Sequence, residues 1–375
     1  NNPDRLTSQL GVQHRLPNSA QLQLKNSYSR FNRTITIPAY VFKGLQQSSF
    51  SELTYHRTGE VSEWIGGINV VTDAFNEEAA ANSERNYQYN TYGVFIQNTW
   101  SPAEKLTIET GLRGDYVSEY GFELLPRLSL LYRISPKWTM RVGGGSGYKV
   151  PTIFTEDAER LQFRNILPIN ENNVHNERSV GSNWDINYRT QWGDLGFSIN
   201  QLFFYTRLRR PLVLTQLWNG LAFENADGHM DTKGMETNIK FTYGDFKLFV
   251  GYTYVDANTH FNDNKKRLPL TARHRLNNVL MWEKEEEWKV GLEAYYVSPQ
   301  QLSDGAMGKQ YWITGLMIEK IWERFSLFLN FENFTDTRQT RFDTIYTDNI
   351  SNPQFRDIYA PVDGFVINGG FKIKL

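Results

Sequence analysis

The sequence predicts an all-β protein whose strands form a transmembrane antiparallel β-barrel. Three features predict it: apolar and polar residues alternate along successive segments, short turns alternate with long polar connections, and tryptophans flank the short turns. Alternation with a period of two gives each strand one apolar and one polar face. Because indoles are most stable at the headgroup level of a bilayer, a row of them at one end of consecutive hairpins indicates a membrane rim.

Six of the ten tryptophans flank short polar turns on the apolar side of their strands: Trp100, Trp138, Trp192, Trp282, Trp288 and Trp322. A soluble sheet has no physical reason to align indoles at one end of its hairpins on an outer face. Their position therefore favours a barrel, whose apolar face meets lipid, over a soluble β-sandwich or propeller, whose apolar face is a protein core.

The strands follow in chain order. Apolar faces are predicted for Leu106, Ile108, Leu112, Tyr116; Leu128, Leu130, Tyr132, Ile134; Trp184, Ile186, Tyr188; Phe325, Leu327, Leu329, Phe331; and Phe365, Ile367, Phe371, Ile373, Leu375. The residues between them are mostly charged, amide or hydroxyl side chains or glycine, as expected for a wet barrel interior.

The connections alternate in length. Short turns are predicted near 16–19, 57–60, 101–104, 135–137, 193–194, 244–245, 284–287 and 323–324, and long loops near 74–88, 149–178, 257–271, 298–309 and 335–363. Outer-membrane barrels have short periplasmic turns and long outer loops. To keep the 244–245 turn on the periplasmic side, we predict one long strand over 194–216, with Pro211 at a bulge.

This reading gives about 17 strands, the last ending at the periplasm, and places Asn1 on the outer side. A barrel with both termini in the periplasm has an even strand number. We therefore expect residues 1–375 to be the C-terminal portion of one barrel domain of ~22 strands, the size that carries a plugged lumen. The N-terminal strands and the plug domain would lie upstream of this chain.

Composition excludes several classes of protein. The net charge of -1 gives no electrostatic reason to expect nucleic acid as a partner. The chain has no cysteine, so it holds no disulfide and no thiol chemistry. No nucleophile–base–acid arrangement is visible, and we predict neither an enzyme nor a bound cofactor or metal.

Five segments carry family-like motifs: residues 92–100 (YGVFIQNTW), 111–116 (GLRGDY), 147–152 (GYKVPT), 173–179 (NVHNERS) and 330–336 (NFENFTD). In this order they resemble TonB-dependent outer-membrane receptors, particularly those of Bacteroidetes-type bacteria. Asn172 and Asn176 depart from the prolines usual in the fourth motif, and Leu375 stands where the family ends on an aromatic residue. The resemblance spans roughly residues 88–375.

The resemblance implies a multi-pass barrel in the cell outer membrane that binds a scarce extracellular small molecule and imports it. A ferric siderophore is the expected cargo, and haem, cobalamin and an oligosaccharide are alternatives. The implied partners are outer-membrane lipid and lipopolysaccharide, the protein's own plug domain, the TonB energy-transducing complex acting through the upstream part, and a surface lipoprotein. Rival functions are a passive porin and a small barrel enzyme, such as a protease or lipase.

Candidate ligand-binding residues lie on the outer loops: Arg160, Arg164, His175, Arg209 and Arg210. Loops on a rigid scaffold often carry binding residues. His175 would be the axial ligand if the cargo were haem. Together with Arg207, the arginines at 209 and 210 would clamp an anionic chelate, contact outer-leaflet phosphates, or simply extend from the rim into water.

Candidate plug-facing residues lie on the polar faces: Arg113, Asp115, Arg127, Arg133, Arg141 and Arg189, with Asp185, Lys372 and Lys374. They are polar enough to hydrogen-bond a plug, and would equally line an open channel. Gly143, Gly145 and Gly147 share one strand, where glycine permits close approach or a bend.

Overall fold

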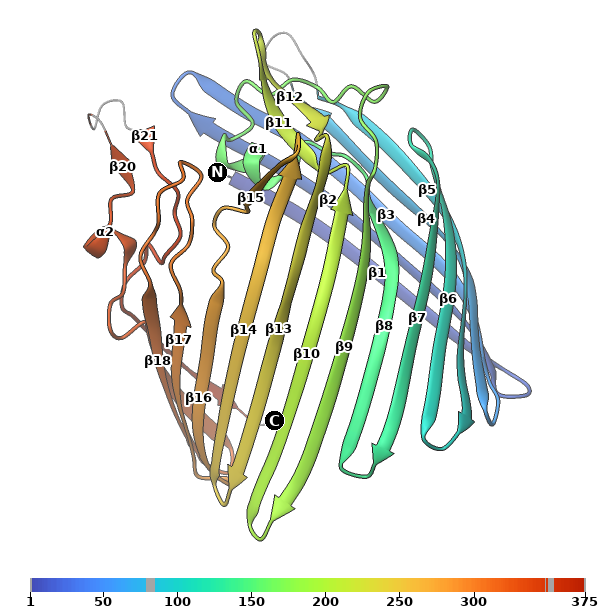
Figure 1. The fold of residues 1–375 in the computed structure, drawn as a ribbon, viewed down its shortest axis with the longest axis vertical. Helices are drawn as coiled ribbons and strands as arrows, with labels where there is room; N and C mark the ends of the chain where they lie inside the picture. Colours follow the sequence, from blue (N-terminus) through green and yellow to red (C-terminus); the bar gives the residue numbers. More distant parts are fainter. Residues whose placement is uncertain (1, 79–84, 348, 350–353, 374–375) are drawn as a thin grey trace.

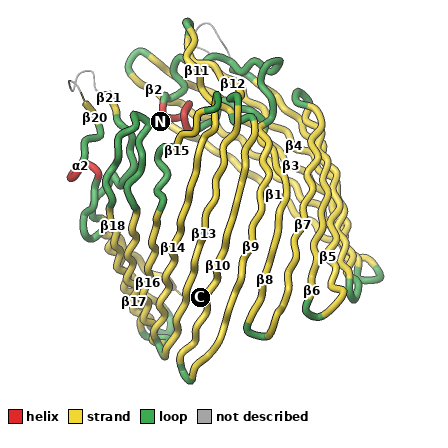
Figure 2. Tube along the Cα trace, in the orientation of Figure 1, coloured by secondary structure: helices red, strands yellow, loops and turns green. Residues whose placement is uncertain are grey.

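The computed structural model describes residues 2–78, 85–347, 349 and 354–373. Over these residues the chain forms one curved antiparallel wall of long strands (Figures 1 and 2). The connections at one end are short turns, and the other end carries the long connections together with the short turns at 38–39 and 118–120. The helices of the described part are the short α1 (Glu156–Arg160) and α2 (Gln339–Phe342). No helix in this part of the chain has the length and apolar character needed to cross a membrane.

Consecutive strands pair in chain order. The first half of the wall contains β1 (Asn2–Leu16), β2 (Ala20–Ile37), β3 (Tyr40–Thr58), β4 (Ser62–Glu77), β5 (Tyr87–Ala103), β6 (Leu106–Val117), β7 (Gly121–Ser135), β8 (Trp138–Lys149) and β9 (Glu177–Trp192). The second half contains β10 (Leu195–Arg209), β13 (Gly228–Tyr243), β14 (Phe246–Phe261), β16 (His274–Lys284), β17 (Trp288–Val297), β18 (Tyr311–Ile321), β19 (Phe325–Glu332) and β22 (Val366–Ile373).

These strands number 17, as predicted. The short β15 (Asn264–Arg267) adds an eighteenth, which pairs only with the outer end of β14. Two further hairpins, β11 (Leu212–Leu217) with β12 (Gly220–Asn225) and β20 (Tyr346–Thr347) with β21 (Gln354–Phe355), lie among the long connections. Among the described residues β1 pairs with β2 and β22 with β19, and no pairing joins β1 to β22, so the wall has two free edges.

The eight predicted short turns all lie at the end of the wall opposite the long connections, within a residue or two of their predicted positions. Gly193 and Gly244 have φ values of 59° and 51°, a left-handed conformation that glycine adopts without steric cost. Register is continuous along most pairs, and the shifts between Trp100 and Ala103 and between Arg133 and Ser135 fall beside turns. The alternation of faces therefore runs unbroken across the wall.

The prediction of one strand over 194–216 is wrong in part. β10 ends at Arg209, Arg210 takes a φ of 54°, and the buried Pro211 leads into the separate β11–β12 hairpin. A proline cannot donate to the sheet ladder, so the wall strand ends before it rather than bulging past it. The orientation of the turn at 244–245 is nonetheless as predicted, because β13 pairs with β10.

The predicted tryptophan row lies on the outer face. Trp100, Trp138, Trp192 and Trp322 are 46%, 39%, 55% and 39% exposed, while Trp282 and Trp288 are half-buried. Neighbouring rings stack at this rim, with centroids 4.4 Å apart for Trp138 and Tyr188 and 4.6 Å apart for Trp322 and Phe325. The indoles are therefore not in a closed protein interior.

A second aromatic row lies nearer the long connections. Trp184 stacks on Phe203 at 5.3 Å, and Trp312 lies 5.2 Å from Tyr296. On β9 the two rows are represented by Trp184 and Trp192, so the distance between them is about 26 Å along the strand at ~3.3 Å per residue, and less across a tilted wall. At the ~35–45° tilt of such strands this corresponds to a height of about 19–22 Å, somewhat less than the apolar band of a membrane barrel, which is about 25 Å tall. The final residues Lys374 and Leu375 lie outside the described part.

Candidate functional site

The long connections gather at the outer end of the wall and form its mouth (Figure 1). The connection over 150–176 joins β8 to β9 and carries α1, and we call it the mouth loop. The β11–β12 hairpin lies between β10 and β13, and the connection between β19 and β22 carries α2. Contacts among these segments determine which side chains are left exposed at the mouth.

An aromatic cluster holds the mouth loop against the inner face of β3–β5. Phe42 and Phe75 lie on inward positions of β3 and β4 and are almost fully buried. Phe163 of the loop stacks on Phe42 at 4.3 Å, and Phe154 meets Phe75 edge-on at 5.0 Å. Burying four aromatic rings gives the loop its own hydrophobic core, so it is a folded cover rather than a loose connection.

Charged residues fasten the same loop. Arg85, 6% exposed, forms an ion pair with Glu77 and donates to the carbonyl of Phe163. Arg33 Nη1 lies 2.6 Å from Glu159 Oε1. Burial works against the charge of Arg85, but the contact with Glu77 more than compensates and raises its pKa, so the guanidinium is always charged.

Asp357 joins three connections. One carboxylate oxygen accepts from Arg160 Nη2 at 2.7 Å, and the other accepts from the Ser303 N–H at 2.5 Å. Its side chain is only 5% exposed. The mouth loop, the β17–β18 connection and the β19–β22 connection are therefore linked through one carboxylate.

The β19–β22 connection has a polar centre of its own. The Tyr359 hydroxyl donates to Asp343 Oδ2 at 2.8 Å, and Arg356 Nη1 lies 3.3 Å from Asp343 Oδ1. Burial alone would raise the pKa of Asp343, but hydrogen bonds from Tyr359 and Thr344 N–H and the charge of Arg356 lower it below its usual value. Asp343 is therefore ionised near neutral pH.

Two open spaces adjoin these contacts. A cavity of about 400 Å³ lies beneath the β19–β22 connection, lined by residues that include Glu156, Arg275, Gln300 and Tyr311. A wider groove of about 750 Å³ follows the inner face of β6–β9 and is lined by Arg127, Arg141 and the glycines of β8 and β9. Both carry charged side chains that can hydrogen-bond to a hydrophilic partner.

The predicted outer-loop residues fall into two groups. Arg160 is engaged with Asp357, whereas Arg164 and the side chain of His175 are exposed on the mouth loop. The backbone of His175 is fixed by Asn225 of the β11–β12 hairpin, through bonds of 2.6 Å and 3.0 Å. Arg209 alternates onto the outward side of β10, and Arg210 follows it at the base of the hairpin. Arg160, Arg164 and His175 thus lie on one connection, where Arg160 and the His175 backbone have different partners, and Arg209 lies on another face.

The predicted lumen residues lie on the inner face, and most are paired. Arg113 Nε donates to Asp115 at 2.8 Å, and Tyr148 donates to the same carboxylate at 2.9 Å. Arg141 meets Asp185 at 2.8 Å, and Arg127 meets Glu109 at 3.2 Å.

The remaining predicted positions differ in their surroundings. Arg133 binds the carbonyl of Glu104 at 3.2 Å, near the turn end of the wall, and Arg189 is exposed. Lys372 lies 3.1 Å from Glu319. Whether these groups contact a plug stays a prediction.

Sequence reasoning missed the two features that organise the mouth, the aromatic cluster and Asp357. The local signal for the cluster was weak, since Phe42 and Phe75 lie on mixed faces that also carry Phe50, Ile65 and Val71. Nothing near Asp357 in sequence indicates that Arg160 and Ser303 will be its partners.

The family described as "TonB dependent receptor-like, beta-barrel" matches residues 1–334. Among curated proteins, the chain is 31% identical over 72 residues to the iron-regulated outer membrane virulence protein of Vibrio cholerae. It is 20% identical over 255 residues to the vitamin B12 transporter BtuB of the same species.

Two solved structures illustrate the fold. A ferric enterobactin receptor of Pseudomonas aeruginosa aligns with a TM-score of 0.74 at 14% identity, and the FrpB iron transporter of Neisseria meningitidis aligns with 0.75 at 14%. Each alignment covers 98% of this chain, but 61% and 63% of the respective solved chains. The chain likewise spans 11% and 38% of the two curated relatives.

Proposed function

The chain belongs to the TonB-dependent receptor-like β-barrel family, and from that premise we propose that it forms much of the wall and mouth of a receptor that imports a ferric siderophore or similar iron chelate. Members of this family are receptors and transporters of the outer membrane, not enzymes. The observation that supports the proposal most is the folded cover at the mouth, which presents exposed side chains above an inner groove.

Several exposed apolar side chains stand on the outer connections. Trp218, at the tip of the β11–β12 hairpin, is 96% exposed, and Phe355 and Met307 are also exposed. Large aromatic surfaces left in water often mark recognition sites. Arg164 and His175 are also exposed on the outer connections. Together with the exposed apolar side chains, they would supply planar contacts and charge for a bulky chelate.

The choice of an iron chelate rests on the named relatives. The two solved structures are described as a ferric enterobactin receptor and an iron transporter, and one curated relative is iron-regulated. Cobalamin is the second candidate, because one curated relative, matched over 255 residues, is a vitamin B12 transporter. Haem and oligosaccharides stay as further candidates.

The inner groove would serve the step after ligand binding, in which a plug domain moves. The groove is lined by arginines paired with carboxylates and by glycines of β8. A side chain would not fit at Gly143, because its Cβ would lie 2.9 Å from Asn183 Oδ1. Such a surface suits hydrogen bonding to a globular plug, which we propose is supplied by the same protein and rearranged by the TonB complex.

Uptake by cells tests the proposal. A strain that depends on this receptor should accumulate iron from one ferric siderophore, should lose that uptake when TonB is deleted, and should induce the gene under iron limitation. Trp218→Ala and Arg164→Ala should each raise the half-saturating siderophore concentration by about three- to tenfold, the range of a removed interface anchor. Lys137→Ala, in a short turn at the opposite end, is the matched control and should leave uptake unchanged.

Three results would contradict the proposal. TonB-dependent uptake of cobalamin without any uptake of iron would mean that the cargo is cobalamin and not an iron chelate. Uptake that persists without TonB would indicate a passive porin. An unchanged half-saturating siderophore concentration in both variants would show that Trp218 and Arg164 do not bind the ligand.

A further inference from the structure

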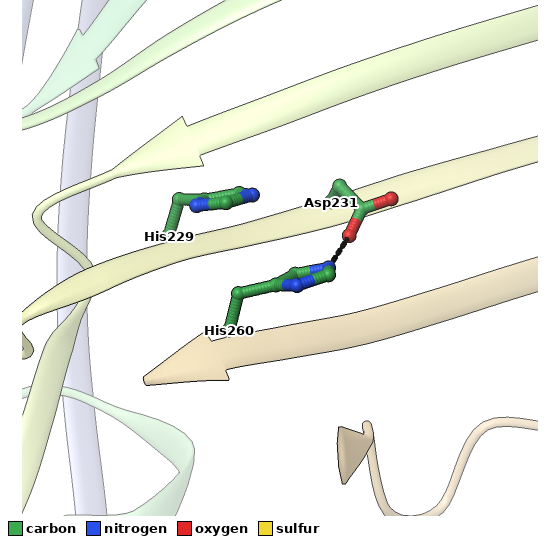
Figure 3. Close-up of side chains that lie close together, drawn as sticks. All are labelled: His229, Asp231 and His260. Atoms are coloured by element: carbon green, nitrogen blue, oxygen red, sulfur yellow. Dashed lines mark hydrogen bonds and ion pairs between the residues drawn. The ribbon is translucent and has the colours of Figure 1, made fainter. Parts of the chain in front are cut away.

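Two histidines and an aspartate from β13 and β14 lie together on the outward side of the wall. His229 and His260 are direct partners in the antiparallel register, although they are far apart in sequence. Asp231 follows two residues after His229 on the same face. Ligand atoms of all three lie within 4.8 Å of one another. Figure 3 shows the two imidazole rings side by side and the contact of His260 with Asp231.

The face on which they lie follows from alternation. The register between β13 and β14 is continuous from Gly228 to Tyr243, so His229 shares its face with Tyr243, an exposed residue of the outer aromatic surface. His260 shares its face with the exposed Phe246 for the same reason. The cluster therefore points away from the lumen and off the path of any imported cargo.

The cluster also lies above the apolar band. Phe203, in the outer aromatic row, pairs with Met235, and His229 is further along β13 by about 20 Å at ~3.3 Å per residue. At this level the outward face carries Asp231, Lys233 and Asp256 rather than apolar side chains. The three groups are thus in a polar environment that water and ions reach.

The residue types are those that bind divalent transition metals. Zn²⁺ takes imidazole nitrogen and carboxylate oxygen at about 2.0–2.2 Å, and open sites use three protein ligands with water as the fourth. Ligand atoms in such a site are about 3.3–3.6 Å apart, so side-chain shifts on the order of 1 Å would suffice here.

Access and partial burial suit a bound ion. The side chains of His260 and Asp231 are 29% and 13% exposed. A cavity of about 310 Å³ adjoins them, lined by Asp227, Gly228 and Asp263 among others. It leaves room for a water ligand and a route for entry.

Two existing contacts define what a metal must replace. His260 Nε2 and Asp231 Oδ1 share a hydrogen bond. A metal ion bound between these two atoms would replace the proton of that bond and would still attract the carboxylate. Arg207 Nη2 lies 3.2 Å from His229 Nδ1, and because a guanidinium only donates, this nitrogen accepts and Nε2 carries the hydrogen. A metal that takes either nitrogen of His229 must break or weaken the contact with Arg207.

We propose that His229, Asp231 and His260 form a binding site for a divalent transition metal such as Zn²⁺, and that Arg207 competes with the metal for His229. The site is independent of the cargo proposed above. It binds an ion on the outer surface of the wall, where it would link the outer ends of β13 and β14.

Zinc titration of the purified protein tests the proposal. The full protein, extracted in detergent, free of tags and stripped with a chelator, is titrated with Zn²⁺ by calorimetry and its metal content measured. One zinc per molecule should be lost in His229→Ala and in His260→Ala and kept in His274→Ala, a histidine on adjacent β16 that bonds to Tyr252 instead. Arg207→Ala should tighten the site about tenfold, the value of one charged hydrogen bond.

Two outcomes would overturn the proposal. One is equal zinc content in the wild type and in a variant lacking both histidines. The cluster would then be an ordinary ion pair of His260 with Asp231, beside a His229 ring that stacks on His260 with centroids 4.5 Å apart. The other is unchanged or weaker affinity in Arg207→Ala. Heat-dependent gel mobility shows that each variant is a folded barrel. The Arg207 variant tests the site by a gain in zinc affinity, which misfolding would not produce.

Discussion

At the scale of single residues, the mouth depends on a few buried charges. Asp357 accepts from groups on two other connections, and Arg85 holds the mouth loop from β5's side of the wall. A buried carboxylate stabilises its surroundings only while its partners are present. Asp357 and Arg85 therefore add charged links between segments that also share other contacts. Gln300 and the Lys309 N–H of the β17–β18 connection, for example, both hydrogen-bond to Tyr359.

Replacing Asp357 tests this view. Asp357→Ala leaves the Ser303 N–H and Arg160 without their acceptor, and should lower the free energy of local opening by about 1–3 kcal/mol. Hydrogen exchange at residues 156–165 and 300–306 should rise accordingly. Asp157→Ala is the control, because Asp157 is 63% exposed and lies 3.9 Å from the same arginine. Equal exchange in both variants would contradict the role given to Asp357.

Asp343 predicts an acid limit for the β19–β22 connection. Its pKa is lowered in the folded protein, so its contribution to stability is present above the ordinary value of 3.8 and is lost as pH falls through the lower folded value. Protease resistance of this connection should therefore hold from neutral pH to about pH 4 and decrease below it.

Asp343→Asn should remove that additional acid sensitivity and lower protection at neutral pH. A pH profile identical to that of the wild type would show that other carboxylates control the acid response.

At the scale of the strand, side chains that point alternately outward and inward place neighbouring residues in two different environments. On β5, Ile96 is 51% exposed on the outward face midway between Tyr92 and Trp100, and Gln97 points inward beside it. The two positions are neighbours in sequence and pair with the same strands. They form a matched pair for measuring what each face contacts.

Arginine at these two positions should have unequal effects. Ile96→Arg places a charge in the middle of the lipid band and should destabilise the barrel by about 2–4 kcal/mol. Gln97→Arg faces the wet interior and should cost well under half as much. Urea unfolding in lipid vesicles, followed by tryptophan fluorescence, measures both. Equal losses would mean that the two faces share one environment.

The strands were predictable from sequence because their signals are local. Turn residues such as Gly193 and Gly244, and alternation within each segment, need no knowledge of distant residues. The break at Arg210 was missed because a polar segment before proline fits both a bulge and a strand end. The aromatic cluster and the Asp357 contacts depend on pairs such as Phe42 with Phe163, which only the folded wall brings together.

At the scale of the whole molecule, the curved wall combines an apolar exterior, a polar interior and a covered mouth. The exterior explains why so many large apolar side chains are exposed, including Leu112, Phe371 and Ile373. In water such a surface would aggregate, whereas in a bilayer it is satisfied by lipid. The tied connections are all at one end of the molecule, where we propose that the ligand binds.

The central claim is that lipid covers the outward face of this wall. The chain has no cysteine, so single cysteines introduced in turn at residues 92–100 can each carry a nitroxide label in lipid vesicles. Collision rates with oxygen, which concentrates in lipid, should peak at even positions, and rates with a water-soluble nickel chelate should peak at odd positions, with a period of two. Collision profiles without that alternation, or with water contact on both faces, would contradict the account.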